Sequence, residues 1–128
     1  MKSLFFVDQD QTKIQLLQKT FGEDFTIEGF STGTACIERI KELEKLNEDL
    51  PEVIIIDYGL TDINGLKLQK KLQKLLEDTK IILMVSREHD EVLLKIIKAG
   101  IMNYIMKDYN YLPLLKSILY YRHSSYPI

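Results

Sequence analysis

The sequence predicts an α/β fold, a doubly wound five-stranded parallel sheet with helices on both faces. Short apolar runs, rich in β-branched and aromatic residues, alternate along the chain with longer segments whose apolar residues recur at helical spacing. The apolar runs are mostly unbroken by polar residues, as is typical of strands that are buried on both faces. Right-handed crossovers between such strands favour the flavodoxin-like order 2-1-3-4-5, a (βα)5 architecture.

The strongest strand signal is at residues 53–56, four β-branched aliphatic residues in succession. Residues 3–7 stop abruptly at acids, and residues 25–30 end near Gly29. The runs that we predict as strands are residues 3–7, 25–30, 53–56, 80–85 and 102–106.

Between these runs, apolar residues at helical spacing predict the helices. Ser31 or Thr32 is placed to cap the second helix, and Gly100 to end the fourth, because glycine tolerates the left-handed conformation. The predicted helices cover residues 14–21, 35–46, 65–77, 90–99 and 111–122.

Composition restricts the class of protein. The chain has 128 residues, which we interpret as one domain over residues 1–128, with 45% hydrophobic and 28% charged residues. The net charge is −2 and the basic residues are scattered, so we expect no nucleic-acid groove. No apolar run reaches the roughly 18–20 residues that cross a bilayer, and Cys36 is the only cysteine. We therefore expect a cytoplasmic protein without membrane contacts.

Polar residues follow the first and third strands, whose carboxyl ends frame the crevice at the switch point of this strand order. Asp8, Gln9 and Asp10 follow the first strand and Asp57 follows the third. Carboxylates gathered at one crevice repel each other unless a cation intervenes. Mg²⁺ suits such a place, because it takes one or two carboxylates and completes its shell with water or phosphate.

Two more strand ends point to the same crevice. Ser86 follows the fourth strand and offers a hydroxyl, and Lys107 follows the fifth and offers a mobile cation. Together with Asp57 these residues predict a phosphoryl-transfer site. The carboxylate is the nucleophile, and the cations and the hydroxyl stabilise the phosphoryl oxygens.

Four stretches of the sequence carry a resemblance to a known family: FFVDQD, VIIIDYGLTDINGL, ILMVS and KAGIMNYIMKDY. Their order and approximate spacing are those of the response-regulator receiver family, which the chain resembles over nearly its whole length. The resemblance implies a phosphoacceptor module of two-component signalling. A histidine kinase or phosphotransfer protein would donate the phosphoryl group in a Mg²⁺-dependent step. A downstream protein would bind the face made by the fourth helix, fifth strand and fifth helix. It implies no enzyme beyond self-catalysed phosphoryl acceptance.

The resemblance also implies a role for individual residues. Asp57 is the phosphoacceptor and Gly59 lends its backbone carbonyl to Mg²⁺, beside Asp8 and its neighbours. Ser86 is the switch hydroxyl, Tyr104 the aromatic switch, and Lys107 the lysine that contacts the phosphoryl group.

Four positions depart from the family's pattern. Gln9 stands where the family has a second acid that ligates the metal directly, so Mg²⁺ affinity should fall unless Asp10 compensates. Thr61 replaces a common proline, Arg87 replaces a small residue after the switch hydroxyl, and Asp108 replaces the proline that commonly follows the lysine.

Structural roles are open for several of these residues. Asp57 alone would be interpreted as a strand-end cap, Ser86 as a helix cap and Tyr104 as a core aromatic residue. Asp10 precedes a periodic segment and suits a helix N-cap, and Gln9 could be inert.

Two other functions compete with the phosphoacceptor. Gln9 and Arg87 favour a pseudo-receiver, a module that binds proteins without being phosphorylated. A flavodoxin-like small-ligand binder lacks support, because no glycine-rich or Ser/Thr-rich phosphate loop follows Val7. The chain leaves no room for an output domain after the last helix, so we expect a stand-alone receiver or a piece of a longer protein.

Overall fold

The computed structural model describes residues 2–86, 88, 90–107 and 111–120, and in them five parallel strands form one sheet in the order β2-β1-β3-β4-β5. The predicted fold class and strand order are confirmed. The strands are β1 (Lys2–Val7), β2 (Phe25–Phe30), β3 (Val53–Asp57), β4 (Lys80–Ser86) and β5 (Tyr104–Lys107). The helices are α1 (Gln11–Phe21), α2 (Gly33–Leu46), α3 (Gly65–Leu75), α4 (Asp90–Lys98) and α5 (Tyr111–Tyr120).

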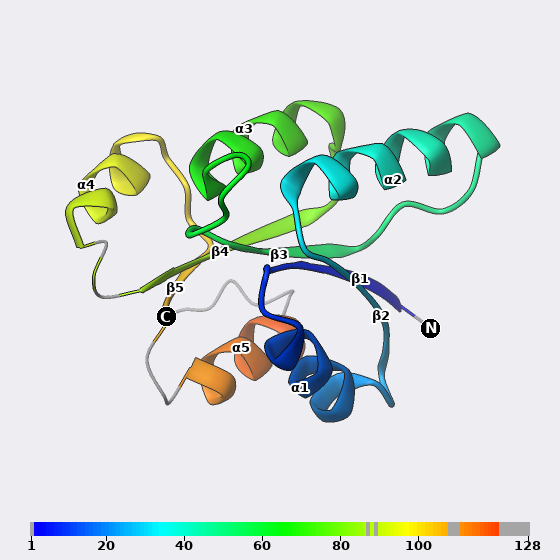
Figure 1. The fold of residues 1–128 in the computed structure, drawn as a ribbon, viewed down its shortest axis with the longest axis horizontal. Coiled ribbons are helices and arrows are strands. Elements are labelled where there is room, and N and C mark those ends of the chain that lie inside the picture. The colour runs from blue at the N-terminus through cyan, green and yellow to red at the C-terminus, as the bar shows by residue number, and fades with distance from the viewer. Residues whose placement is uncertain (1, 87, 89, 108–110, 121–128) are drawn as a thin grey trace.

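Helices cover the sheet in two layers, with α2, α3 and α4 on one face and α1 and α5 on the other (Figure 1). Each central strand contributes to both layers by alternation. In β3, Ile54 and Ile56 join the core under α2, α3 and α4, whereas Val53 and Ile55 join the core under α1 and α5. Both faces of these strands are therefore buried, which is why they read as unbroken apolar runs. None of the helices in the described part of the chain is long and apolar enough to cross a membrane.

Side-chain caps fix where three helices begin. The carboxylate of Asp10 accepts the backbone N–H of Thr12 at 3.0 Å, so the N-cap interpretation of Asp10 is confirmed. Thr32, one of the two residues predicted for this role, caps α2, and Asn64 caps α3.

The start of β5 differs from its prediction. The strand begins at Tyr104, two residues after the predicted start at Met102. The residues between α4 and the strand form a turn that ends the helix. Gly100 has φ +75° and donates to Ile97, and Ile101 donates to Ile96, the hydrogen-bond pattern of a Schellman turn. Gly100 and Ile101 therefore belong to the end of the helix and not to the strand. Met102, which follows them, is 87% exposed.

Gly65 brings the start of α3 against the end of β3. Its N–H donates to the carbonyl of Tyr58 at 3.2 Å. A Cβ at this position would lie 2.6 Å from the Tyr58 Cα and 3.0 Å from the Asp57 carbonyl oxygen. Both neighbours are backbone atoms, so they cannot move aside by a change of rotamer.

Gly65→Ala is therefore expected to destabilise the protein by about 1–3 kcal/mol, because the backbone next to Asp57 must shift. Urea unfolding followed by circular dichroism measures the change. Lys70→Ala, at an exposed position of the same helix, serves as the control and should lie within about 0.5 kcal/mol of the wild type. Equal stability of Gly65→Ala and wild type would show that the close approach is not a real constraint.

Candidate functional site

The carboxyl ends of the strands bring the predicted site residues to one edge of the sheet. Asp57, Ser86 and Lys107 are the last residues of β3, β4 and β5, and Asp8 directly follows β1. In the sheet register Val7 pairs with Ile56, the residue before Asp57, and Ser86 pairs with Lys107. Asp57 itself pairs with Met84, so β4 and β5 extend two residues beyond it at this edge. The position therefore follows from the strand order, as the sequence predicts.

Lys107 and Asp57 form an ion pair across the end of β4. The Lys107 Nζ lies 2.6 Å from Asp57 Oδ1, and the two side chains are only 16% and 10% exposed. Burial alone would lower the pKa of the Lys107 ammonium. The hydrogen bond and charge of Asp57, together with the charge of Asp8, raise the Lys107 pKa above its ordinary value instead. The Lys107 ammonium therefore keeps its positive charge next to the carboxylate of Asp57.

Asp8 is a second buried carboxylate at this edge, 3% exposed. Its Oδ1 accepts the backbone N–H of Asp10 at 2.9 Å. Burial raises the pKa of Asp8 and the charge of Asp57 raises it further, although the Asp10 hydrogen bond and the charges of Lys107 and Lys13 act in the opposite direction. The two carboxylates thus repel each other, and a cation between them would relieve this repulsion.

Gln9 and Asp10 point to other partners. The Gln9 side chain is exposed, and its Oε1 accepts the hydroxyl of Thr61 at 3.2 Å. The Asp10 carboxylate is engaged at the start of α1. Among the residues that the structure describes, no group of three or more His, Cys, Asp or Glu side chains is placed to hold a metal ion. The predicted metal roles of Gln9, Asp10 and Gly59 stay predictions.

Of the two predicted switch residues, Ser86 is the last residue of β4 and Tyr104 is the first residue of β5. The hydroxyl of Ser86 lies 3.4 Å from Glu88 Oε1, and the side chain is half-buried. Tyr104 is half-buried against the core under α2, α3 and α4, as its interpretation as a core aromatic residue requires. Their movement remains a prediction. Arg87, His89, Asp108 and His123 lie outside the described residues.

Asp62 holds the β3–α3 loop in place, and the sequence analysis did not identify it. Its carboxylate accepts the backbone N–H groups of Gly33 and Thr34 at 3.1 and 3.0 Å and the Thr34 hydroxyl at 2.8 Å. Slight burial would raise the pKa of Asp62, but these hydrogen bonds lower it. Its partners stand 28 and 29 positions away, so no local pattern pointed to this contact.

The two departures Gln9 and Thr61 also prove to be neighbours. The Thr61 hydroxyl and the Gln9 amide join the β1–α1 loop to the β3–α3 loop. The next residue, Asp62, joins the same loop to the start of α2, so two consecutive residues hold the loop that follows Asp57. Fifty-two positions separate Thr61 from Gln9, which is why sequence inspection treated them as unrelated.

Comparison with known proteins gives one consistent family. The family described as response regulator receiver domain matches residues 4–119. A chemotaxis protein CheY homolog of Campylobacter jejuni (strain 81-176) is 31% identical over 111 residues, which cover 83% of this chain and 81% of that protein. The DNA-binding transcriptional activator DevR/DosR of Mycobacterium tuberculosis is 25% identical, and the match covers 92% of this chain and 53% of the relative.

Solved structures agree. A response regulator receiver domain protein (CheY-like) from Methanospirillum hungatei JF-1 superposes with a TM-score of 0.76 at 26% identity, covering 93% of this chain and 91% of that chain. A BeF3-activated DrrB receiver domain shares the fold with a TM-score of 0.76 at 22% identity, covering 97% of this chain and 99% of that chain. With a family match over most of its length and this fold, the chain belongs to the response regulator receiver family of two-component signalling.

Proposed function

We propose that this receiver domain accepts a phosphoryl group on Asp57 from a histidine kinase or phosphotransfer protein. The observation that carries the proposal is the buried ion pair between Lys107 and Asp57 at the carboxyl edge of the sheet. An exposed aspartate that merely ends a strand has no need of a desolvated cation. A site that must receive the negative charge of a phosphoryl group does.

The chemistry follows from these side chains. A carboxylate oxygen of Asp57 attacks phosphorus, an oxygen–phosphorus bond forms, and the donor's nitrogen–phosphorus bond breaks with its electron pair left on the imidazole. Lys107 then moves from the carboxylate to the phosphoryl oxygens, which carry the greater charge. Ser86, at the neighbouring strand end, donates its hydroxyl to the same oxygens and biases the domain toward its active state.

The donor set at this edge suits Mg²⁺. Asp8 and Asp57 provide two mutually repelling carboxylates, which match the one or two that Mg²⁺ takes in proteins. Asp8, Asp57 and the Gly59 carbonyl would hold the ion, with Gln9 or Asp10 contributing directly or through water. When bound, Mg²⁺ would neutralise charge on the phosphoryl oxygens.

A pseudo-receiver is the second candidate, and the Thr61–Gln9 hydrogen bond favours it. The Gln9 oxygen that would face a metal already has a protein partner. In that case the domain would bind other proteins without phosphorylation. In both cases we propose a cytoplasmic signalling module that acts on proteins and contacts neither nucleic acid nor membrane. Its downstream target would bind the face formed by α4, β5 and α5.

Acetyl phosphate with Mg²⁺ is expected to add one phosphoryl group to the wild type and none to Asp57→Asn, since the amide keeps the shape but removes the nucleophile. Intact-mass spectrometry measures the adduct, and thermal unfolding checks that the variant is folded. Labelling of both proteins would place the acceptor elsewhere. Labelling of neither would favour the pseudo-receiver.

Gln9→Asp is expected to tighten Mg²⁺ binding by about 1–2 kcal/mol, because it adds a charge beside the other carboxylates. The same charge should lower stability in EDTA, where no ion offsets the repulsion. Calorimetric titration and urea unfolding measure the two effects. Gln9→Asn, which shortens the side chain equally without adding charge, is the control. Lower stability in EDTA with unchanged Mg²⁺ affinity would place residue 9 outside the metal pocket.

Asp8→Asn is expected to stabilise the metal-free protein at neutral pH. The pKa of Asp8 is raised in the folded state, so its ionised form costs stability above that pKa. The gain should shrink as pH falls through the raised pKa toward the ordinary value of 3.8, because wild-type Asp8 becomes neutral there. Urea unfolding in EDTA across this pH range measures it, with the exposed substitution Asp49→Asn as the control. A variant that is less stable than wild type at neutral pH would contradict the assigned repulsion.

A further inference from the structure

Helix α3 carries four exposed lysines and no acidic residue. Their spacing of three, four and seven positions places them along one side of the helix. We call this surface the α3 lysine face, made of Lys67, Lys70, Lys71 and Lys74. All four lie within eight consecutive residues, 67–74, although basic residues are scattered along the chain as a whole.

Nothing within the described residues neutralises the α3 lysine face. No salt bridge to any described residue is found for its four members, whereas Arg39 on α2 pairs with both Glu28 and Glu42. Like charges three and four positions apart destabilise a helix, and Lys67 stands in the first turn, where the helix dipole disfavours a cation. The stability of α3 therefore does not account for this arrangement.

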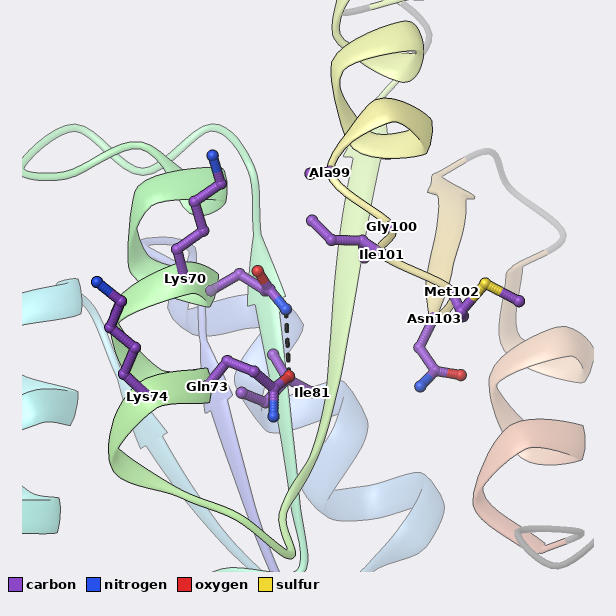
Figure 2. A pocket seen from close by; sticks show the side chains of 10 residues that line it. Lys70, Gln73, Lys74, Ile81, Ala99, Gly100, Ile101, Met102 and Asn103 are labelled. Atoms are coloured by element: carbon purple, nitrogen blue, oxygen red, sulfur yellow. Dashed lines mark hydrogen bonds between the residues drawn. The ribbon is translucent and has the colours of Figure 1, made fainter.

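The surface is hollowed on either side of these lysines. A groove of about 290 Å³ is lined by Ile63 and all four members of the α3 lysine face. A second cavity of about 530 Å³ lies between α3 and residues 99–103 (Figure 2). Its walls combine apolar side chains with amides, and Lys70 and Lys74 of the α3 lysine face also line it (Figure 2). The lining side chains used here are Ile81, Ile101, Met102, Gln69, Gln73 and Asn103.

We propose that this surface docks an acidic, amphipathic segment of a partner protein. Carboxylates of the segment lie over the α3 lysine face, and an apolar side chain enters the cavity beside Ile81 and Ile101. The side-chain amide of Asn103, which lines the cavity, is placed to bind the backbone of the segment, whereas the Gln73 amide already bonds to Gln69 and to the Leu76 carbonyl. The size of the cavity suits one or a few side chains, and its mixture of apolar walls with a few polar groups is typical of binding sites.

The distribution of charge favours a short acidic protein segment over nucleic acid as the ligand of this surface. The whole chain has a net charge of −2, and at the C-terminal end of α3 the carboxylates of Glu77 and Asp78 line a further cavity with Lys74. A long polyanion that continued past Lys74 would meet these acids. A short segment with an apolar anchor avoids them.

The cavity of this surface lies away from the proposed phosphoacceptor. The cavity in Figure 2 lies near the amino ends of β4 and β5, since Ile81 is the second residue of β4 and Asn103 precedes β5. Asp57 lies at the opposite, carboxyl edge. Asp57→Asn should therefore leave binding at the α3 lysine face unchanged, and failure of one proposal leaves the other testable.

Fluorescence anisotropy with a labelled peptide of two Leu-Glu-Glu-Leu-Glu-Glu-Ala heptads tests the proposal. The wild type should bind the peptide saturably, and the triple variant Lys67→Gln, Lys70→Gln, Lys71→Gln should bind roughly tenfold more weakly, the sum of three modest ion pairs. Gln has a helix propensity close to that of Lys, so α3 should stay folded, which circular dichroism checks. The matched control Lys19→Gln, Lys41→Gln, Lys45→Gln removes the same charge from exposed positions on α1 and α2 and should bind within about twofold of the wild type.

Two further probes separate the parts of the surface. A peptide with every Leu replaced by Gln should bind more weakly to the wild type, because nothing fills the cavity. An oligothymidylate should bind more weakly than the acidic peptide. The proposal is overturned by an absence of saturable peptide binding, by equal losses in the two triple variants, by equal affinity for the Leu-free peptide, or by tighter binding of the oligothymidylate.

Discussion

The ion pair between Lys107 and Asp57 is the interaction around which the site is organised. It joins the ends of β3 and β5 across β4, so it depends on the register of three strands at once. Each strand can deliver its last residue to this edge only because its apolar body is buried on both faces between two layers of helices. The pair in turn gives a buried carboxylate the cation that it needs in a desolvated place.

Much of the fold could be predicted because a parallel sheet imposes a strong local signal. In β3, four β-branched residues in succession have no good alternative to a buried strand, and the apolar spacing along α2 fixes which side of that helix packs on the sheet. The predicted start of β5 was wrong because the Schellman turn at Gly100 includes residues whose composition alone suits a strand. A hydrogen-bond pattern at a helix end decides this boundary, and composition does not record it.

Much of the candidate site was predictable for a related reason. Asp8, Asp57, Ser86 and Lys107 each stand next to or at a strand end, and strand order then places them together. Asp62 and the Thr61–Gln9 bond were missed because they join loops that lie far apart in the sequence, through side chains whose partners no local spacing reveals. The α3 lysine face was missed for another reason. Its residues are ordinary surface lysines one at a time, and only their alignment along a helix, beside two cavities, distinguishes them.

The Thr61–Gln9 hydrogen bond and the Asp62 contacts together reduce the conformational freedom of the loops beside Asp57. Loops that flank a phosphoacceptor lose conformational freedom when they close on their ligands, and that loss opposes binding. Here the β1–α1 and β3–α3 loops are already joined to each other and to the start of α2 by protein contacts alone. Their freedom is lost once, during folding, so less remains to be lost when an anion or cation arrives. In the phosphoacceptor that we propose, a weaker electrostatic attraction at position 9 would be partly offset by this more rigid frame.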